Sequence, residues 1–220
     1  MTVVSGRGGF PSNLRLDGLT ALVTGGGRGI GAATAGALAC VGAQVLVMSR
    51  TRSDLDQVVA SVEASGGKAS ALVCDVTDSA CVRETIAALP RLDILVNNAG
   101  MNIPEAFVEV TEEHLDAIIN LNVRSMFVVA QAAVRKMLEL PQRREVGGAV
   151  VNITSQMGHV GAARRTVYCM TKHAIEGLTK AMGVELAPQN IRVNSVAPTF
   201  LGARLSNSPI AAADCSRGGV

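Results

Sequence analysis

Aromatic residues are scarce in this sequence. The chain of 220 residues holds no Trp, one Tyr and four Phe, so aromatics make up 2% of it. Proteins bind single-stranded nucleic acids largely by stacking the bases on aromatic side chains. The formal net charge of +2 is close to neutral and indicates no strongly basic surface. Both observations argue against a nucleic-acid-binding protein.

Cysteine pairs and long apolar segments are also lacking. The five Cys show no CxxC spacing, so the sequence predicts neither a disulfide framework nor a metal site. Several of them lie in apolar runs and are expected to be buried free thiols, as in a reducing compartment. The N-terminal residues lack the apolar segment of a signal peptide, and no apolar run reaches the length of a bilayer span. We therefore expect a cytoplasmic protein that makes no membrane contact.

Apolar runs alternate with helix-like stretches along most of the chain. The runs of strand length cover 20–24, 43–49, 69–76, 92–98, 148–154 and 191–197. The helix-like stretches cover 29–41, 53–65, 78–88, about 111–139 and 166–187. This alternation predicts an α/β fold, a doubly wound, Rossmann-like parallel sheet of about six strands with helices on both faces. We expect one domain over 18–205, a leader over 1–17 and an irregular tail over 206–220.

The segment TGGGRGIG lies where the first predicted strand ends and the first helix begins. A helix N-terminus carries partial positive charge and unpaired N–H groups, and glycine lets a phosphate approach the backbone. We interpret the segment as a dinucleotide-binding loop, and the alternative is a turn that is rich in glycine by chance. The candidate residues are Thr24, Gly25, Arg28, Gly29, Ile30 and Gly31.

Four motifs in order resemble those of the short-chain dehydrogenase/reductase family. They are the glycine loop, NNAG at 97–100, Asn122 within LNVRSMF, and Ser155 followed by Tyr168-Cys-Met-Thr-Lys172. The resemblance runs from about residue 17 to 201. Within this family, the sequence is most similar to the 3-oxoacyl-carrier-protein reductase and sugar dehydrogenase branches.

The pair Tyr168 and Lys172 is spaced for general acid–base chemistry. Residues four apart share one face of a helix, and a nearby ammonium lowers the pKa of a tyrosine. The resemblance implies that Ser155 orients a carbonyl, Tyr168 acts as general acid or base, and Lys172 also binds the nicotinamide ribose. It further implies that Asn122 holds a relay water. The expected reaction interconverts a small-molecule ketone and a secondary alcohol by hydride transfer.

The end of the second predicted strand favours NADP(H) over NAD(H). An acidic residue there would bind the ribose hydroxyls of NAD, but the sequence has Ser49 and Arg50. An arginine suits a 2′-phosphate, although Arg50 can also be read as a solvated charge. The resemblance implies further cofactor contacts from Asp75, Val76, Asn98, Ala99, Gly100 and Pro198.

The sequence departs from the family near its C-terminus. Thr199 stands where the family has glycine, and Ala203 where it has a threonine that contacts the cofactor. The last family strand has no counterpart, so we expect a C-terminally shortened member. The alternative function is a catalytically impaired chain that acts only as a nucleotide-binding or interaction module. The resemblance also implies a homodimer formed through the helices near 111–139 and 166–187.

Overall fold

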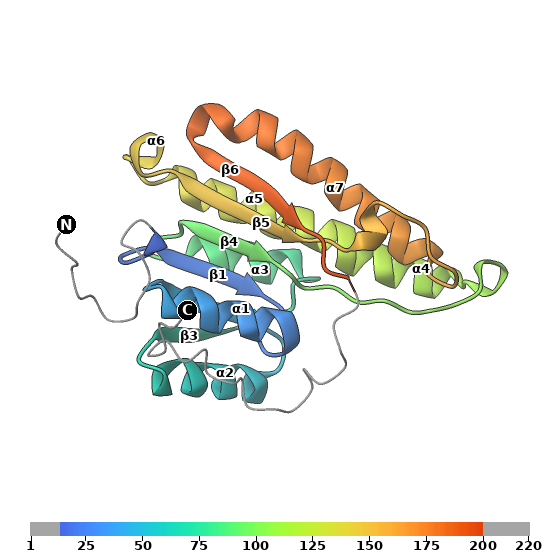
Figure 1. Cartoon of the computed structure of the whole chain (residues 1–220), viewed down its shortest axis with the longest axis horizontal. Coiled ribbons are helices and arrows are strands. Elements are labelled where there is room, and N and C mark those ends of the chain that lie inside the picture. Colours follow the sequence, from blue (N-terminus) through green and yellow to red (C-terminus); the bar gives the residue numbers. More distant parts are fainter. Residues whose placement is uncertain (1–13, 200–220) are drawn as a thin grey trace, which may run out of the picture. The chain divides into compact units, whose positions relative to one another are not determined.

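The computed structural model describes residues 14–199, which divide into two compact units, 14–73 and 74–199. Figure 1 shows these residues in colour, as strands connected by helices. Most of the expected leader, the expected tail and Ala203 lie outside the described residues, and the expected domain boundaries stay predictions.

The unit 14–73 is built on three parallel strands with β2 in the middle. Leu22 pairs with Leu46, and Leu46 pairs with Ser70. The strands β1 and β2 are almost fully buried, which explains why they read as continuous apolar runs. The elements are β1 (Thr20–Thr24), α1 (Gly29–Cys40), β2 (Gln44–Ser49), α2 (Arg52–Ala64) and β3 (Lys68–Val73).

The unit 74–199 carries three more parallel strands, with β5 in the middle. Val96 pairs with Val151, and Val151 pairs with Asn194. The strands are β4 (Ile94–Asn97), β5 (Gly148–Ile153) and β6 (Ile191–Val196). The α-helices are α3 (Ser79–Ala87), α4 (Glu112–Ile119), α5 (Ser125–Leu138), α6 (Arg143–Val146) and α7 (Thr166–Leu186). Short turns of helix are η2 (Phe107–Glu109), η3 (Asn120–Arg124), η4 (Gln156–Gly158) and η5 (Ala187–Gln189).

The strand order is β3-β2-β1-β4-β5-β6. Parallel strands that alternate with helices in this order confirm the predicted doubly wound α/β fold. All six predicted strands are found, and only their ends shift by a few residues, as at β4. The predicted helix over 111–139 is instead three elements, because a π-helical turn, η3, separates α4 from α5.

The short helix α6 contains one buried charged residue. Its Arg143 is 3% exposed, although the neighbouring residues are solvated. The guanidinium donates to the carbonyl of Met137 at 2.8 Å, to the carbonyl of Leu92 at 2.8 Å and to the Asp93 carboxylate at 3.1 Å. A buried charge needs such partners. The segment is therefore ordered by tertiary contacts that its local sequence does not indicate.

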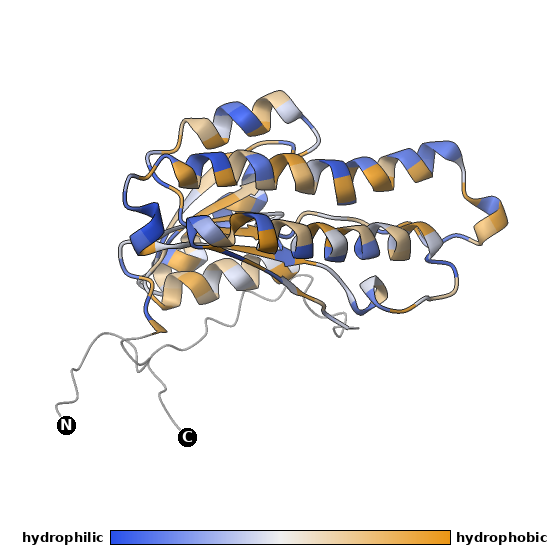
Figure 2. Ribbon diagram, turned by 90° about the horizontal axis from the view of Figure 1, so that it is seen from above, coloured by the Kyte–Doolittle hydropathy of each residue, from blue (hydrophilic) through white to orange (hydrophobic). Residues whose placement is uncertain are grey.

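The residues Glu112–Leu138 form a helical stretch that is long and apolar enough to cross a membrane, with mean hydropathy 1.4. The expectation that no apolar run reaches this length is therefore wrong. Half of that window is buried inside the structure, as in the core helix of a soluble protein. The side chains of Met126, Val129, Ala133 and Met137 are at most 1% exposed. Figure 2 shows apolar and polar residues interspersed along the helices.

The cysteines only partly match the expected free thiols. Cys74 and Cys169 are buried and Cys81 is half-buried, and all three are free. The Sγ atoms of Cys74 and Cys81 lie 2.6 Å apart. Cys40 is disulfide-bonded, so the expectation is wrong at that position.

Candidate active site

The predicted dinucleotide loop joins β1 to α1 within the first unit. Thr24 is fully buried at the end of β1, and Gly25 and Gly29 adopt the left-handed conformation, with φ of +62° and +54°. Such backbone angles favour glycine. The helix α1 begins after Arg28, whose side chain does not cap it, and its first turn holds no acidic residue. The loop therefore ends at a helix N-terminus suited to an anion.

The middle of the loop has no room for side chains. A Cβ atom on Gly26 would lie 2.9 Å from the carbonyl oxygen of Val23 and 3.0 Å from Val47 Cβ. A Cβ atom on Gly27 would lie 3.0 Å from Asp54 Cβ and 3.1 Å from Ser49 Oγ. The backbone is thus pressed against β1, β2 and the start of α2. This packing fits a loop whose N–H groups approach a pyrophosphate.

The residues expected to select the cofactor lie at the end of β2. Ser49 is its last residue, beside the glycine loop, and Arg50 follows it with an exposed side chain. Arg52, two residues later, donates to the Asp56 carboxylate at 2.8 Å and 3.0 Å. Asp54 on α2 also lies against the loop.

The second unit holds the residues of the expected proton-transfer set. Ser155 directly follows the end of β5 and is 8% exposed, and Tyr168 and Lys172 lie on the first turns of α7. Lys172 is 4% exposed, and its Nζ atom donates to the carbonyl of Ile153 at 2.9 Å. The same Nζ atom lies over the Tyr168 ring, 5.6 Å from its centre. The expected Ser, Tyr and Lys therefore converge where β5 meets α7.

Asn122 lies in the π-helical turn η3 and is fully buried. Its amide donates to the carbonyl of Met101 at 2.8 Å and to the Thr171 hydroxyl at 3.2 Å. Its carbonyl oxygen accepts from the Met101 N–H at 2.8 Å. The side chain therefore ties the loop after β4 to α7. A π-helical turn is often found at functional sites, because it presents a residue that a regular helix would turn away.

The NNAG segment continues from β4 toward Asn122. Asn97 donates to the carbonyl of Met126 at 2.8 Å, which anchors the end of β4 on α5. A Cβ atom on Gly100 would lie 3.2 Å from Asn122 Oδ1 and 3.8 Å from Lys172 Nζ. Asn98 and Ala99, which lie between Asn97 and Gly100 in the chain, are half-buried. Gly100 therefore borders the Asn122–Lys172 pair.

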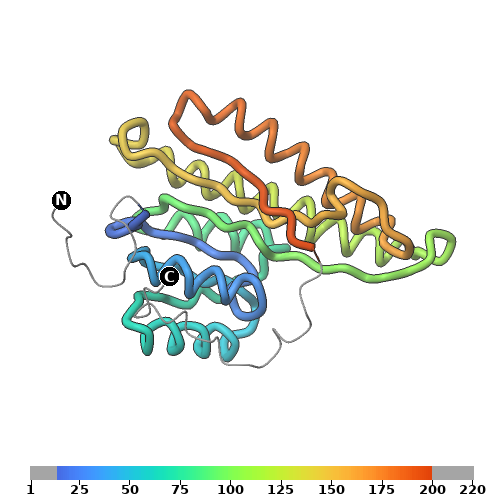
Figure 3. Tube along the Cα trace, viewed as in Figure 1, coloured from blue at the N-terminus to red at the C-terminus, as the bar shows by residue number. Residues whose placement is uncertain are grey.

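The remaining predicted residues occupy the loops of the second unit. Asp75 accepts from the N–H and the hydroxyl of Thr77 at 2.9 Å and 2.7 Å, and Val76 is buried. The carbonyl of Pro198 accepts from the Gln156 N–H at 3.0 Å. The loop after β4 lies beside the loop before α7 (Figure 3), where the Glu105 N–H donates to the carbonyl of Arg164 at 3.0 Å.

Comparisons with known proteins agree with this geometry. The family model of the short chain dehydrogenases matches residues 19–212. The chain belongs to that family. L-xylulose reductase of Mus musculus is 42% identical over 190 residues, which cover 86% of this chain and 74% of the relative. Carbonyl reductase (NADPH) 2 of Sus scrofa is 40% identical over 189 residues, with the same coverage.

A solved structure gives the same result. The crystal structure of a short-chain type dehydrogenase/reductase from Mycobacterium marinum has a TM-score of 0.79 and 39% sequence identity. It matches 85% of this chain and 74% of that one. As a short-chain dehydrogenase, the chain is an oxidoreductase that acts on CH–OH groups with NAD(P).

Burial sets the charge states in this short-chain dehydrogenase. It lowers the pKa of Lys172 to about 8. It also raises the pKa of Tyr168, although the hydrogen bond with Ser155 and the charge of Arg165 oppose the shift. This direction is opposite to the expected lowering by Lys172. The reason is that removing a tyrosinate from water costs more free energy than its hydrogen bond and the neighbouring charges supply.

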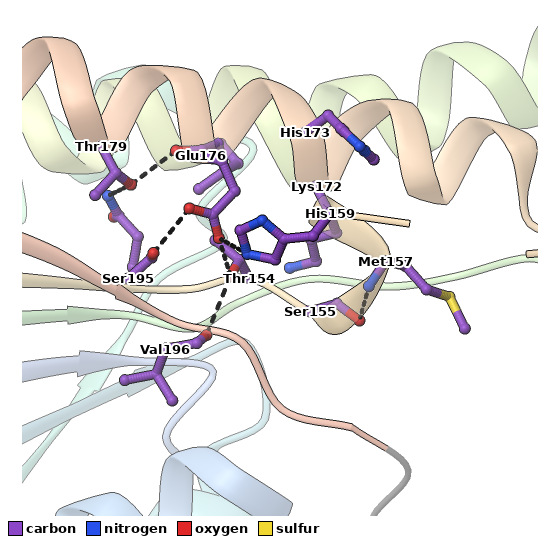
Figure 4. A network of polar contacts seen from close by, with 12 residues as sticks. Thr154, Ser155, Met157, His159, Lys172, His173, Glu176, Thr179, Ser195 and Val196 are labelled. Atoms are coloured by element: carbon purple, nitrogen blue, oxygen red, sulfur yellow. Dashed lines mark hydrogen bonds and ion pairs between the residues drawn. The ribbon is translucent and has the colours of Figure 1, made fainter. Parts of the chain in front are cut away.

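The sequence did not indicate a role for Thr154, Glu176 or Ser195. Thr154 precedes Ser155, and Glu176 follows Lys172 by four residues, on the same face of α7. The spacing alone could have suggested Glu176, because it repeats the spacing between Tyr168 and Lys172. Figure 4 shows these side chains with His159 around one carboxylate.

We expect Lys172→Met to change stability in a pH-dependent way. Burial lowers the pKa of Lys172 from its ordinary value of 10.5 to about 8 in the folded chain. Between these values the unfolded chain binds more protons at this residue, so its contribution to stability rises with pH. Burial of the Lys172 ammonium therefore destabilises the wild type most below pH 8, and this effect disappears toward pH 10.5. The Met variant lacks it at every pH.

Urea unfolding of the variant and the wild type across this pH range measures the effect. The variant's advantage in unfolding free energy should be greatest near neutral pH and shrink by on the order of 1–3 kcal/mol toward the alkaline end. Lys180→Met, an exposed lysine on the same helix, is the matched control. A difference that does not vary with pH would contradict the prediction.

Proposed function

We propose that this chain is an NADP(H)-dependent reductase of small ketones, with Tyr168 as its general acid or base. The observation that carries the proposal is the convergence of Ser155, Tyr168 and Lys172 where β5 meets α7. A hydroxyl that binds a carbonyl oxygen, an adjacent acid and a buried cation are the groups that a carbonyl reduction needs from a protein.

Each residue has a separate part in the proposed reaction. The nicotinamide supplies the hydride when it is bound. Ser155 donates to the substrate oxygen and orients the carbonyl. Tyr168 holds a proton at its hydroxyl and gives it to that oxygen, and its raised pKa keeps it in the acid form before the reaction. Lys172 stabilises the tyrosinate that remains, because below about pH 8 it carries a positive charge.

The residues that would hold the cofactor are those of the glycine loop, with Arg50 beside the 2′-phosphate. The close packing at Gly26 and Gly27 and the start of α1 support a bound pyrophosphate. Asn98, Ala99 and Gly100 would line the nicotinamide side, next to Lys172 and Asn122. The amide N–H groups of Asn122 already bind Met101 and Thr171, and its Oδ1 atom accepts one hydrogen bond from Met101. The proposed relay water would therefore bind the main chain of Asn122 or the second lone pair of Oδ1.

Small sugars and polyols are the proposed substrates. The related L-xylulose reductase and carbonyl reductase are named for a sugar and for a carbonyl, and this supports a small polar carbonyl compound as the substrate. Reduction of L-xylulose with NADPH is the assay to try before other ketones.

Tyr168→Phe should abolish reduction while leaving cofactor binding intact. Loss of the proton donor should lower kcat by about 100-fold or more, because general acids contribute that much. NADPH fluorescence measures binding, and loss of NADPH absorbance with the ketone measures turnover. Met170→Leu, a mild change at an exposed position two residues away, is the control. NADPH binding by the wild type without turnover on any ketone would favour the nucleotide-binding module instead.

Arg50→Asp should shift the cofactor preference from NADPH toward NADH. Losing a charged hydrogen bond to a phosphate and gaining a repelling carboxylate should weaken NADPH binding by about tenfold or more. Arg52→Asp is the matched control, because Arg52 is an exposed arginine two residues away whose guanidinium binds Asp56. Equal losses in the two variants would contradict the role of Arg50.

We also propose a homodimer formed through α5 and α7. Both helices expose large apolar side chains, among them Phe127 and Leu138 on α5 and Met170 and Val184 on α7. Exposed apolar side chains that gather into one patch mark interaction surfaces. The association would leave the residues at the end of β5 unchanged.

Phe127→Glu should turn the dimer into a monomer. A charge placed in an apolar interface is left without a partner, so the affinity should fall at least about tenfold. Light scattering of the variant and the wild type measures the mass. Phe107→Glu is the matched control, because Phe107 is 74% exposed but lies in η2, outside these helices. A wild-type monomer, or a dimer that survives Phe127→Glu, would refute the proposal.

A further inference from the structure

The helix α7 is bound to the end of β5 by three polar contacts at successive residues. The amide of Asn152 donates to the Thr179 hydroxyl at 2.9 Å. The next two residues are paired in turn, the carbonyl of Ile153 with Lys172 at 2.9 Å and the hydroxyl of Thr154 with Glu176 at 2.6 Å. Ser155 is the residue that follows. The strand end that delivers Ser155 is therefore held by the same helix that carries Lys172.

Glu176 accepts hydrogen bonds from more than one element. Its Oε1 atom accepts from Thr154, and its Oε2 atom accepts from the Ser195 hydroxyl of β6 at 2.9 Å. His159 Nε2 lies 3.3 Å from Oε1. Figure 4 marks this contact with a dashed line. The residue is only 7% exposed. One buried carboxylate thus joins β5, β6, α7 and the loop after Ser155.

The contacts keep this carboxylate ionised. Burial alone would raise the pKa of Glu176. The hydrogen bonds from Thr154 and Ser195 outweigh it, with help from the charges of His159 and Lys180, so the pKa lies below its ordinary value. Charged acceptors make stronger hydrogen bonds than neutral ones. We call the contacts of Glu176 with Thr154, Ser195 and His159 the clamp. These contacts are stronger than those of a neutral side chain of the same shape.

The segment after Ser155 is packed against the same turn of α7. A Cβ atom on Gly158 would lie 3.1 Å from the carbonyl oxygen of Lys172 and 3.2 Å from Glu176 Cγ. Between Thr154 and Gly158 in the chain, the Ser155 hydroxyl accepts from the Met157 N–H at 3.2 Å. Ser155 therefore lies between two points, Thr154 and Gly158, that both contact Glu176.

We propose that Glu176 is a positioning residue that fixes the end of β5, and with it the Ser155 hydroxyl, against the turn of α7 that carries Lys172. It acts through Thr154 and Gly158 and touches neither substrate nor cofactor. The catalytic consequence rests on the proposed function, whereas the structural one does not.

Glu176→Gln is the variant that tests the catalytic consequence, because it keeps the shape and removes the charge. We expect kcat for the ketone to fall by about tenfold or more, since small displacements of a catalytic group are costly. The Kd for NADPH should change by less than about threefold, which on this scale is under 1 kcal/mol. Glu185→Gln, an exposed glutamate on the same helix, is the matched control and should retain full activity.

A double-mutant cycle with Ser155→Ala separates positioning from general structural damage. If Glu176 acts through Ser155, adding Glu176→Gln to Ser155→Ala should cost less than about threefold in kcat, because coupled residues are not additive. A loss of the same factor with and without Ser155 would overturn the proposal.

Hydrogen exchange tests the structural consequence without any turnover. Backbone amides of Met157 and Gly158 should exchange about tenfold faster in Glu176→Gln, because both donate to Ser155. Amides of β1 and β2 serve as the internal control. Unchanged protection at 157 and 158 overturns the proposal. Faster exchange in a chain that reduces no ketone would support the clamp and reject only the proposed function.

Discussion

The polar attachment of α7 to the end of β5 is the constraint on which the candidate active site depends. Ser155 comes from the strand, and Tyr168 and Lys172 come from the helix. The contacts from 152, 153 and 154 to α7 hold these groups in one place. Each of these contacts also satisfies a buried polar group, so the requirement for hydrogen-bond partners and the requirement for a fixed site are met together.

Burial shifts the pKa values of the ionisable groups in the site. The ammonium of Lys172 and the hydroxyl of Tyr168 lie where charge is costly, so both groups are shifted toward their neutral forms. Glu176 is buried too, but it stays charged because several donors surround it. The same burial therefore shifts the pKa of a group toward its neutral form where hydrogen-bond partners are few, and leaves a group charged where they are many.

The glycine loop follows a different physical principle, because backbone rather than side chains defines it. Left-handed angles at Gly25 and Gly29 and the absence of room at Gly26 can be met by no other residue without strain. Asn122 shows the complementary case. Its side chain is large and buried, and the π-helical turn orients it so that its amide and carbonyl bind the Met101 backbone.

The sequence by itself determined the six strands and the glycine loop, and its resemblance to a known family predicted the Ser155, Tyr168 and Lys172 set. The apolar runs, the glycine cluster and the i, i+4 spacing of Tyr168 and Lys172 are local features of the sequence. It did not indicate α6, the π-helical turn at Asn122, the raised pKa of Tyr168 or the clamp around Glu176. Each of those depends on partners distant in the chain, such as Asp93 for Arg143 and Ser195 for Glu176. Only the tertiary structure decides which buried polar groups meet, because burial and its partners are set when the strands and helices pack together.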